Sequence, residues 1–385
     1  MSTATLGHVI EISRPRSECA DGVHRVSFTC AGEPVWFESA DAPLQPSIEA
    51  ALGLFLLPAL HHRARLVTDL APDRTWLEGV ARLVAIASRW WGYGSEVPID
   101  HPGSTTGHDD RHAAVGSCFT GGLDSFYALL TRAEQISHLV YVHGYDIALE
   151  DEARIASVDR VLLEVARRTG KRTIRVRSNL RAHRWFGSVN WERTHGAALA
   201  AIGHVLGGTL GTLIIPSSYR VDRLIPWGSH PEIDPLWSTS RVSIEHDDVR
   251  VGREDKVARI VHEPMVWSHL RVCWQNRPGV LNCSRCPKCI RMILAVSAHG
   301  RRREFEVFDR ETPLVDLVDS IPAIREHLVV SWRNILELDL ERDVRRAVER
   351  MLTRSGHGLA AKIARGRRGL SPPRPLAPWV PSPRS

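Results

Sequence analysis

Short apolar strands alternate with longer helical segments between residues 111 and 216, and this alternation constrains the fold more than any other feature of the chain. Strand-like apolar runs occupy residues 113–119, 139–142, 173–176 and 212–216. Between them, apolar residues recur at helical spacing over residues 124–133, 151–168 and 191–206. Neighbouring parallel strands need a crossover of this length, whereas antiparallel neighbours do not. We therefore predict an α/β fold with a doubly wound parallel sheet of about five strands.

A loop with two consecutive glycines follows the first of these strands and opens the first helix. Glycines let the backbone turn tightly and approach a ligand, and a helix N-terminus offers free N–H groups to phosphate. Ligands of open parallel sheets bind at the carboxyl ends of the strands. A glycine turn with an Asp/Ser helix cap is the alternative. The loop is predicted to bind phosphate groups through Thr120, Gly121, Gly122, Leu123, Asp124 and Ser125.

This segment resembles the Ser-Gly-Gly-x-Asp-Ser signature of the pyrophosphate-loop ATPases, with Thr120 in place of the first serine. It lacks the lysine of a Walker A loop. The resemblance implies an adenine nucleotide alpha hydrolase-like fold, ATP cleavage between the α- and β-phosphates, and an adenylated intermediate. Asp124 and Ser125 are then expected to be catalytic, with Asp124 either a ligand of Mg²⁺ or a helix cap.

The ends of two other predicted strands supply further candidates. His143 and Gly144 end the second strand, and the superfamily resemblance implies that they lie near the adenine. Ser217 and Ser218 end the fourth strand and are expected to touch the nucleotide or the substrate. A plain strand-to-loop turn and simple turn capping are the alternatives at these two places.

Four of the seven cysteines lie in one short segment, as Cys273, Cys283, Cys286 and Cys289. Four thiolates separated by short loops can surround a tetrahedral Zn²⁺, and a disulfide-stapled secreted domain would spread its cysteines instead. We predict a structural zinc site. A redox or sulfur-carrying pair of Cys286 and Cys289 is the main alternative, followed by an iron–sulfur cluster or unliganded thiols.

A pyrophosphate loop followed by such cysteines resembles the 7-cyano-7-deazaguanine synthase family. The run Arg253 to Val257 and the run Cys286 to Arg291 stand where that family has a lysine element and a final Cys-x-x-Cys followed by arginine. The resemblance covers residues 112–300 and implies that Lys256 neutralises the leaving pyrophosphate, a solvated helix lysine being the alternative. Residues 226–237 differ from the family's substrate-site sequence. The substrate is therefore left open, including one from a specialised or natural-product pathway.

The chain is expected to contain four parts. Residues 1–110 form a separate prefix without a chemical motif, ending in a linker over 92–110. Residues 111–300 form the catalytic domain, with the zinc segment at 273–289. Residues 301–353 form a helical extension, with helix expected over 321–351. Residues 354–385 read as a disordered, basic, proline-rich tail.

Charge and hydropathy restrict the partners and the compartment. The tail from Arg354 carries seven basic and no acidic residues, so the net charge of +6 leaves the remainder near neutral. A nucleic-acid footprint on the folded region is therefore not expected. No apolar run reaches the ~18–20 residues of a membrane helix, and the N-terminal residues do not show the basic-then-apolar pattern of a signal peptide. We expect a cytoplasmic protein that acts on a small molecule, with a homodimer as an open option.

Several other residues are candidates for the site. His195 is a candidate general base, although a packing role is the simpler interpretation. Asp222, His230 and Asp234 are candidates for substrate contact, and Cys118 is expected to be a buried small residue.

The predicted function is ATP-dependent adenylation of a carboxylate, amide or carbonyl oxygen, followed by displacement of AMP by ammonia or an amine. The alternatives are a pyrophosphate-loop sulfurtransferase, making a thioamide or thiolating tRNA, and a nucleotide-binding protein without catalysis.

Overall fold

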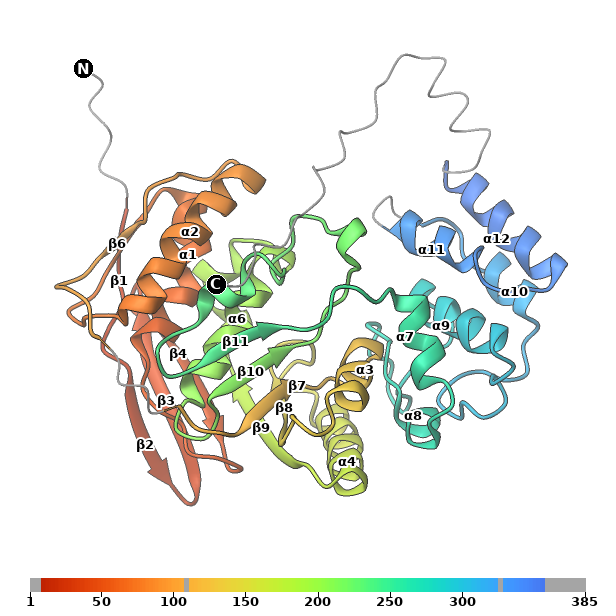
Figure 1. Cartoon of the computed structure of the whole chain (residues 1–385), viewed down its shortest axis with the longest axis horizontal. Coiled ribbons are helices and arrows are strands. Elements are labelled where there is room, and N and C mark those ends of the chain that lie inside the picture. The colour runs from red at the N-terminus through yellow and green to blue at the C-terminus, as the bar shows by residue number, and fades with distance from the viewer. Residues whose placement is uncertain (1–7, 107–110, 325–327, 357–385) are drawn as a thin grey trace, which may run out of the picture. The chain divides into compact units, whose positions relative to one another are not determined.

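The computed structural model describes residues 8–106, 111–324 and 328–356 (Figure 1). The chain divides into two compact units. The first unit consists of Met1–Thr120, Thr131–Ser218 and Leu224–Val249. The second consists of Gly121–Leu130, Tyr219–Arg223 and Arg250–Ser385.

The first unit is built on an eight-stranded sheet with the order β11-β10-β7-β8-β9-β4-β3-β2. Each neighbouring pair from β11 to β9 is parallel, which confirms the predicted α/β fold with a parallel sheet. The four predicted strands are present, and the fifth, β11, was missed because its residues are mostly polar. The parallel strands are β7 (Val115–Cys118), β8 (His138–His143), β9 (Arg172–Ser178), β10 (Thr212–Ile215) and β11 (Ser243–His246).

The prediction of a separate domain over residues 1–110 is wrong for the described part of that segment. Strand β4 (Glu33–Ser39) pairs antiparallel with β9, with Phe37 opposite Ser178, and continues the sheet through β3 (Val23–Cys30) and β2 (Arg16–Ala20). The open edge of β9 carries backbone groups that need partners, and β4 supplies them. The Asp41 carboxylate also accepts hydrogen bonds from the Arg175 guanidinium at 2.8 Å.

Helices cover both faces of this sheet. Helix α1 (Ile48–His62) is apolar around its whole circumference and is almost entirely buried against α6 (Trp191–Val205), as such helices must be. Both belong to the main apolar core, with side chains of β4, β8, β9 and β10. Helix α4 (Glu152–Thr169) packs against β8 and β9 from the other face, where the side chain of Asp159 meets His143. The doubly wound arrangement that the alternation predicted is therefore present.

Residues 92–106 contain more structure than the expected linker. Strand β6 (Ile99–Asp100) pairs parallel with β5 (Arg65–Val67), and β5 pairs with β1 (Val9–Glu11) in a separate three-stranded sheet. Helix α2 (Arg74–Trp91) precedes this stretch and ends on Gly92 in the left-handed conformation. The first unit is completed by short helices: η1 (Leu180–Ala182), α5 (Arg184–Gly187) and η3 (Asp234–Trp237).

The second unit is helical. Its helices are α3 (Leu123–Thr131), η2 (Val221–Arg223), α7 (Arg253–Ile260), α8 (Pro264–His269), α9 (Pro287–Ala298), α10 (Leu314–Asp319), α11 (Val329–Ile335) and α12 (Arg342–Arg354). The boundary predicted at residue 300 does not appear, since the chain from Arg250 onwards belongs to this one unit. The single helix expected over 321–351 is broken between α11 and α12. There the Arg345 guanidinium donates hydrogen bonds to the carbonyls of Leu336 and Leu338.

The expected tail over 354–385 lies outside the described residues from 357 onwards. No helix in the described ranges is long and apolar enough to cross a membrane.

Candidate functional site

The glycine loop has the backbone geometry that a close approach requires. Gly121 has φ of +71°, a left-handed conformation that other residues rarely adopt. The carbonyl of Gly122 accepts hydrogen bonds from the Phe126 backbone N–H and the Ser125 hydroxyl, both at 3.0 Å. Thr120 is exposed at the end of the strand, whereas the Leu123 side chain is buried. Leu123 therefore offers only its backbone to a ligand, and the Ser125 hydroxyl is engaged within the loop.

The carboxylate of Asp124 is paired with two basic side chains of helix α7. Its carboxylate accepts a hydrogen bond from Arg253 Nη1 at 2.7 Å and from Lys256 Nζ at 3.3 Å. Burial by itself raises the pKa of Asp124, but the charges and hydrogen bonds of Arg253 and Lys256 lower it on balance. Asp124 is therefore an anion at neutral pH, with the acceptor chemistry of a Mg²⁺ ligand.

Lys256 is not the solvated helix lysine that the sequence left as an alternative. The residue is only 1% exposed, and its ammonium lies 5.3 Å from the centre of the Tyr127 ring. Burying an unpaired ammonium costs several kcal/mol, and an ion pair with a carboxylate can offset a cost of about this size. Asp124 and Tyr127, both on α3, thus hold the charge of Lys256 at the loop.

Arg291 is a candidate that the site prediction missed. Burial lowers the pKa of the Arg291 guanidinium to about 10, and the nearby charge of Arg253 acts in the same direction. The carboxylates of Glu254 and Asp124 act in the opposite direction. The only sequence signal was its position two residues after the last cysteine. Arg291 is still a cation at neutral pH.

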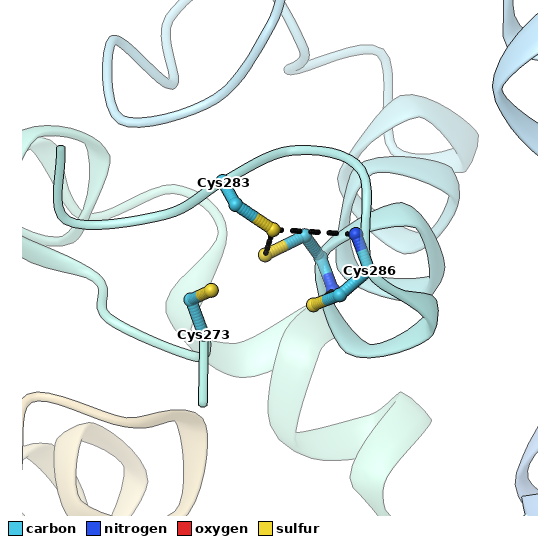
Figure 2. A group of neighbouring side chains, drawn as sticks. Cys273, Cys283 and Cys286 are labelled. Atoms are coloured by element: carbon cyan, nitrogen blue, oxygen red, sulfur yellow. Dashed lines mark hydrogen bonds between the residues drawn. The ribbon is translucent and has the colours of Figure 1, made fainter. Parts of the chain in front are cut away.

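The four cysteines form one cluster. Their Sγ atoms all lie within 4.8 Å of one another, and Cys273, Cys286 and Cys289 are buried. Figure 2 shows Cys273, Cys283 and Cys286 turned toward a common centre. Zinc–sulfur bonds of about 2.3 Å in a tetrahedron place sulfur atoms roughly 3.8 Å apart, and Cys283 and Cys289 lie 3.9 Å apart. The cluster therefore can hold a metal ion such as zinc.

Backbone N–H groups point at these sulfur atoms, as they do where a thiolate is held. The amide of Cys286 lies 3.3 Å from Cys283 Sγ (Figure 2). The amide of Cys289 lies 3.5 Å from Cys286 Sγ. Cys286 thereby caps helix α9, and the amide of Gln275 lies 3.4 Å from Cys273 Sγ. Hydrogen bonds from such donors favour the charged thiolate, which is the form that binds metal.

The buried side chain of Asn282 connects the cluster to the surrounding loops. Its Oδ1 accepts from the amides of Val272 and Cys273 at 2.9 and 3.2 Å. Its Nδ2 donates to the carbonyls of Leu270 and Val307 at 2.7 and 3.3 Å. One amide side chain thus fixes the loop ahead of Cys283.

The cysteine segment also contacts the glycine loop. The backbone N–H of Arg271 donates a hydrogen bond to the carbonyl of Gly121 at 2.7 Å. Arg271 is two residues before Cys273, so the second unit joins the cysteine segment to the loop through main-chain atoms.

The remaining predicted contacts lie in the first unit, at the carboxyl edge of its parallel strands. His143 ends β8 and is hydrogen-bonded through Nε2 to Asp159 at 2.8 Å, whereas its buried Nδ1 has no hydrogen-bond partner among the described residues. Gly144 has φ of +95°, and an added Cβ would come within 2.0 Å of the Ser178 carbonyl, so the fold by itself requires this glycine. Ser217 is fully buried after β10, and Ser218 is exposed.

A second polar group in the first unit surrounds Asp234. This fully buried carboxylate accepts hydrogen bonds from the Ser229 hydroxyl at 2.6 Å and the backbone amide of His230 at 3.2 Å. It also bonds His246 Nδ1 at 2.7 Å. Burial lowers the pKa of His230 to about 4, so this imidazole is neutral at physiological pH. His246 was not among the sequence candidates, because it lies on the missed strand β11.

The other candidate residues have structural explanations. His195 Nδ1 lies 3.1 Å from the carbonyl of Trp191, and burial lowers the pKa of the His195 ring. Asp222 pairs with Arg220 at 2.6 Å. Burial raises the pKa of the Cys118 thiol to about 12, with the charge of Asp234 acting in the same direction, so Cys118 is a packed thiol as expected.

Comparison with known proteins supplies no relative: no family model, no curated protein and no solved structure matches this chain. The functional assignment therefore depends on the residues and their geometry.

Proposed function

We propose that this chain is an ATP-dependent enzyme of the pyrophosphate-loop type, which transfers AMP to an oxygen atom of a small molecule and releases pyrophosphate. The observation that carries the proposal is the Gly-Gly loop at the start of α3, with Arg253 and the buried Lys256 meeting at Asp124. The five parallel strands, with the loop directly after β7, fit an adenine nucleotide alpha hydrolase-like fold.

The positive charges of Arg253 and Lys256 suit the first step of the reaction. A carboxylate, amide or carbonyl oxygen of the substrate attacks the α-phosphorus, and the bond to the β-phosphate breaks. The departing pyrophosphate accumulates negative charge, which Lys256, Arg253 and the loop amides stabilise. A bound Mg²⁺ would neutralise further phosphate charge, and Asp124 is the carboxylate that would hold it.

The second step is a displacement at carbon. Ammonia or an amine forms a C–N bond, one of its protons is lost, and AMP leaves with the activated oxygen. This is the chemistry that the resemblance to the 7-cyano-7-deazaguanine synthase family implies. The substrate class is a small molecule with an activatable oxygen.

The cysteines are assigned to a structural metal in this proposal. Four protein ligands leave no open position on a tetrahedral zinc, so the metal would fold the segment and take no part in the reaction. A sulfurtransferase would need a thiol available to carry sulfur. The close approach of all four Sγ atoms supports the metal over that alternative. Reduced thiols fit a reducing compartment such as the cytoplasm.

Product analysis of ATP consumption tests the proposal. The purified protein is incubated with ATP, Mg²⁺, ammonium and a panel of carboxylates, amides and cyclic carbonyl compounds, with Asp124→Ala as the control. AMP and pyrophosphate, absent with the control variant, support adenylation. ADP and phosphate contradict it, and nucleotide binding without turnover across the panel favours the non-catalytic alternative.

A further inference from the structure

We infer that Arg291 binds the pyrophosphate part of the nucleotide, and that the metal-binding segment is therefore also part of the phosphate site. The inference deepens the proposed function, on which it rests, because it assigns a third cation to the same polyanion. It also predicts something separate, namely that inorganic pyrophosphate binds to the second unit through Arg291.

The first argument is the absence of a partner for Arg291. Within the part of the chain that the structure describes, its guanidinium makes no hydrogen bond and no ion pair. A guanidinium offers five N–H donors in a planar fork that matches the oxygens of a phosphate group. The side chain is half-buried, so these donors can reach a bound ligand or water, and either can supply the acceptors.

The second argument is the balance of charge around this side chain. The ionisable groups with the largest effect on Arg291 are Arg253, Glu254, Asp124 and Tyr219. Asp124 already shares its carboxylate between Arg253 and Lys256. Glu254 accepts a hydrogen bond from Asn334 at 3.2 Å. Arg253 and Arg291, together with Lys256 at Asp124, therefore outnumber Asp124 and Glu254, and both of these carboxylates already accept hydrogen bonds.

The third argument is the position of Arg291 in the fold. It lies on α9, whose first turn begins at the cap Cys286 and contains Cys289. Helix α7, which carries Arg253 and Lys256, packs against α9 within the second unit. A metal held by the cysteines would thus fix the first turn of the helix that carries Arg291. At the other end of the segment, the Arg271 amide is bonded to Gly121 in the loop.

A purely structural role for Arg291 is the competing interpretation. In that case the aliphatic part of the side chain packs against its neighbours, and the charge merely reaches water. The two interpretations differ in ligand affinity, since a packing role leaves the affinity for pyrophosphate unchanged.

The experiment measures the binding of inorganic pyrophosphate, ATP–Mg²⁺ and AMP to the full-length, zinc-loaded protein by calorimetry. Arg291→Met is compared with the wild type and with Arg259→Met. Arg259 lies on α7, pairs with Glu263 at 3.3 Å and is half exposed, so it serves as the matched control. We expect Arg291→Met to weaken pyrophosphate and ATP by about 10- to 100-fold, the value of charge-assisted hydrogen bonds. AMP affinity and the Arg259→Met variant should change by less than about twofold.

Unchanged pyrophosphate affinity in a folded Arg291→Met variant, or no pyrophosphate binding by the wild type, overturns the inference. If Arg291→Met does not fold by circular dichroism, Arg291→Lys decides. The lysine keeps the charge but not the planar fork, so a loss of about 3- to 10-fold supports the inference and an unchanged affinity overturns it. Pyrophosphate binding that depends on Arg291, without any binding of ATP, would keep the anion site and contradict the proposed function.

Discussion

The ammonium of Lys256 lies 3.3 Å from the carboxylate of Asp124, although the two residues are 132 positions apart in the chain. Asp124 lies in the first turn of α3, after the glycine loop, and Lys256 lies on α7, which follows the last parallel strand in the sequence. This ion pair connects the glycine loop with the run Arg253 to Val257, which belong to separate helices far apart in the sequence. Their contact makes both residues part of one site in the second unit.

The first prediction concerns the pH dependence of this pair. The folded-state pKa of Asp124 lies below the unfolded value of about 3.9. Its ionised form therefore adds stability that is fully present above the unfolded pKa and is lost as the pH falls through the folded pKa. Asp124→Asn should lower the free energy of unfolding by about 1–3 kcal/mol at pH 7, as expected for hydrogen bonds to charged groups.

The difference between the wild type and Asp124→Asn should shrink as the pH is lowered below about 4. Urea unfolding at several pH values measures it. A difference that stays constant down to pH 2.5 would show that the Asp124 charge does not contribute. Glu164→Gln is the control. Glu164 is a surface carboxylate on α4 in the first unit and also accepts hydrogen bonds from arginines.

The second prediction concerns the metal. Cys286→Ser removes one of four ligands and the cap of α9, so bound zinc should fall well below one equivalent and the second unit should unfold at lower temperature. Zinc is measured by elemental mass spectrometry and unfolding by calorimetry. Cys19→Ser changes an exposed cysteine outside the cluster and should alter neither quantity. A stable, zinc-replete and inactive Cys286→Ser protein would instead favour sulfur chemistry.

The third prediction concerns Asn282. Its side chain makes four hydrogen bonds to backbone groups around the cluster, and alanine would leave several of these buried groups unpaired. We expect Asn282→Ala to destabilise the protein by about 2–4 kcal/mol and to speed zinc release to a chelator. Gln135→Ala, which removes an exposed amide, should be neutral in both measurements. Equal rates of zinc release from the two variants would mean that Asn282 does not support the cluster.

The fourth prediction concerns the first 106 residues. Their strand β4 covers the edge of β9, and their helix α1 covers α6. A chain that starts at residue 111 therefore exposes an unpaired edge and a large apolar face, and it should aggregate on expression. Solubility and circular dichroism of the truncated chain test this expectation. A monomeric, cooperatively folding product would mean that the segment is a separate domain after all.

Local sequence determined the elements of this protein. The alternation of apolar runs predicted β7 to β10 and the helices between them, because strand and helix periodicity depend on neighbouring residues alone. The spacing of the cysteines likewise predicted that four thiols would meet. Strand β11 was not predicted because its mostly polar residues form no apolar run. The helix predicted over 321–351 was too long because apolar residues keep their helical spacing across the break before α12.

Only the tertiary structure decided which distant residues meet. It placed β4 beside β9, brought Arg253 and Lys256 to Asp124, and left the half-buried Arg291 without an ion pair among the described residues. Pairing at a sheet edge and compensation of buried charge depend on free energies summed over the folded chain. No window of sequence contains both members of such a pair, so the motifs could be found from the sequence but their arrangement could not.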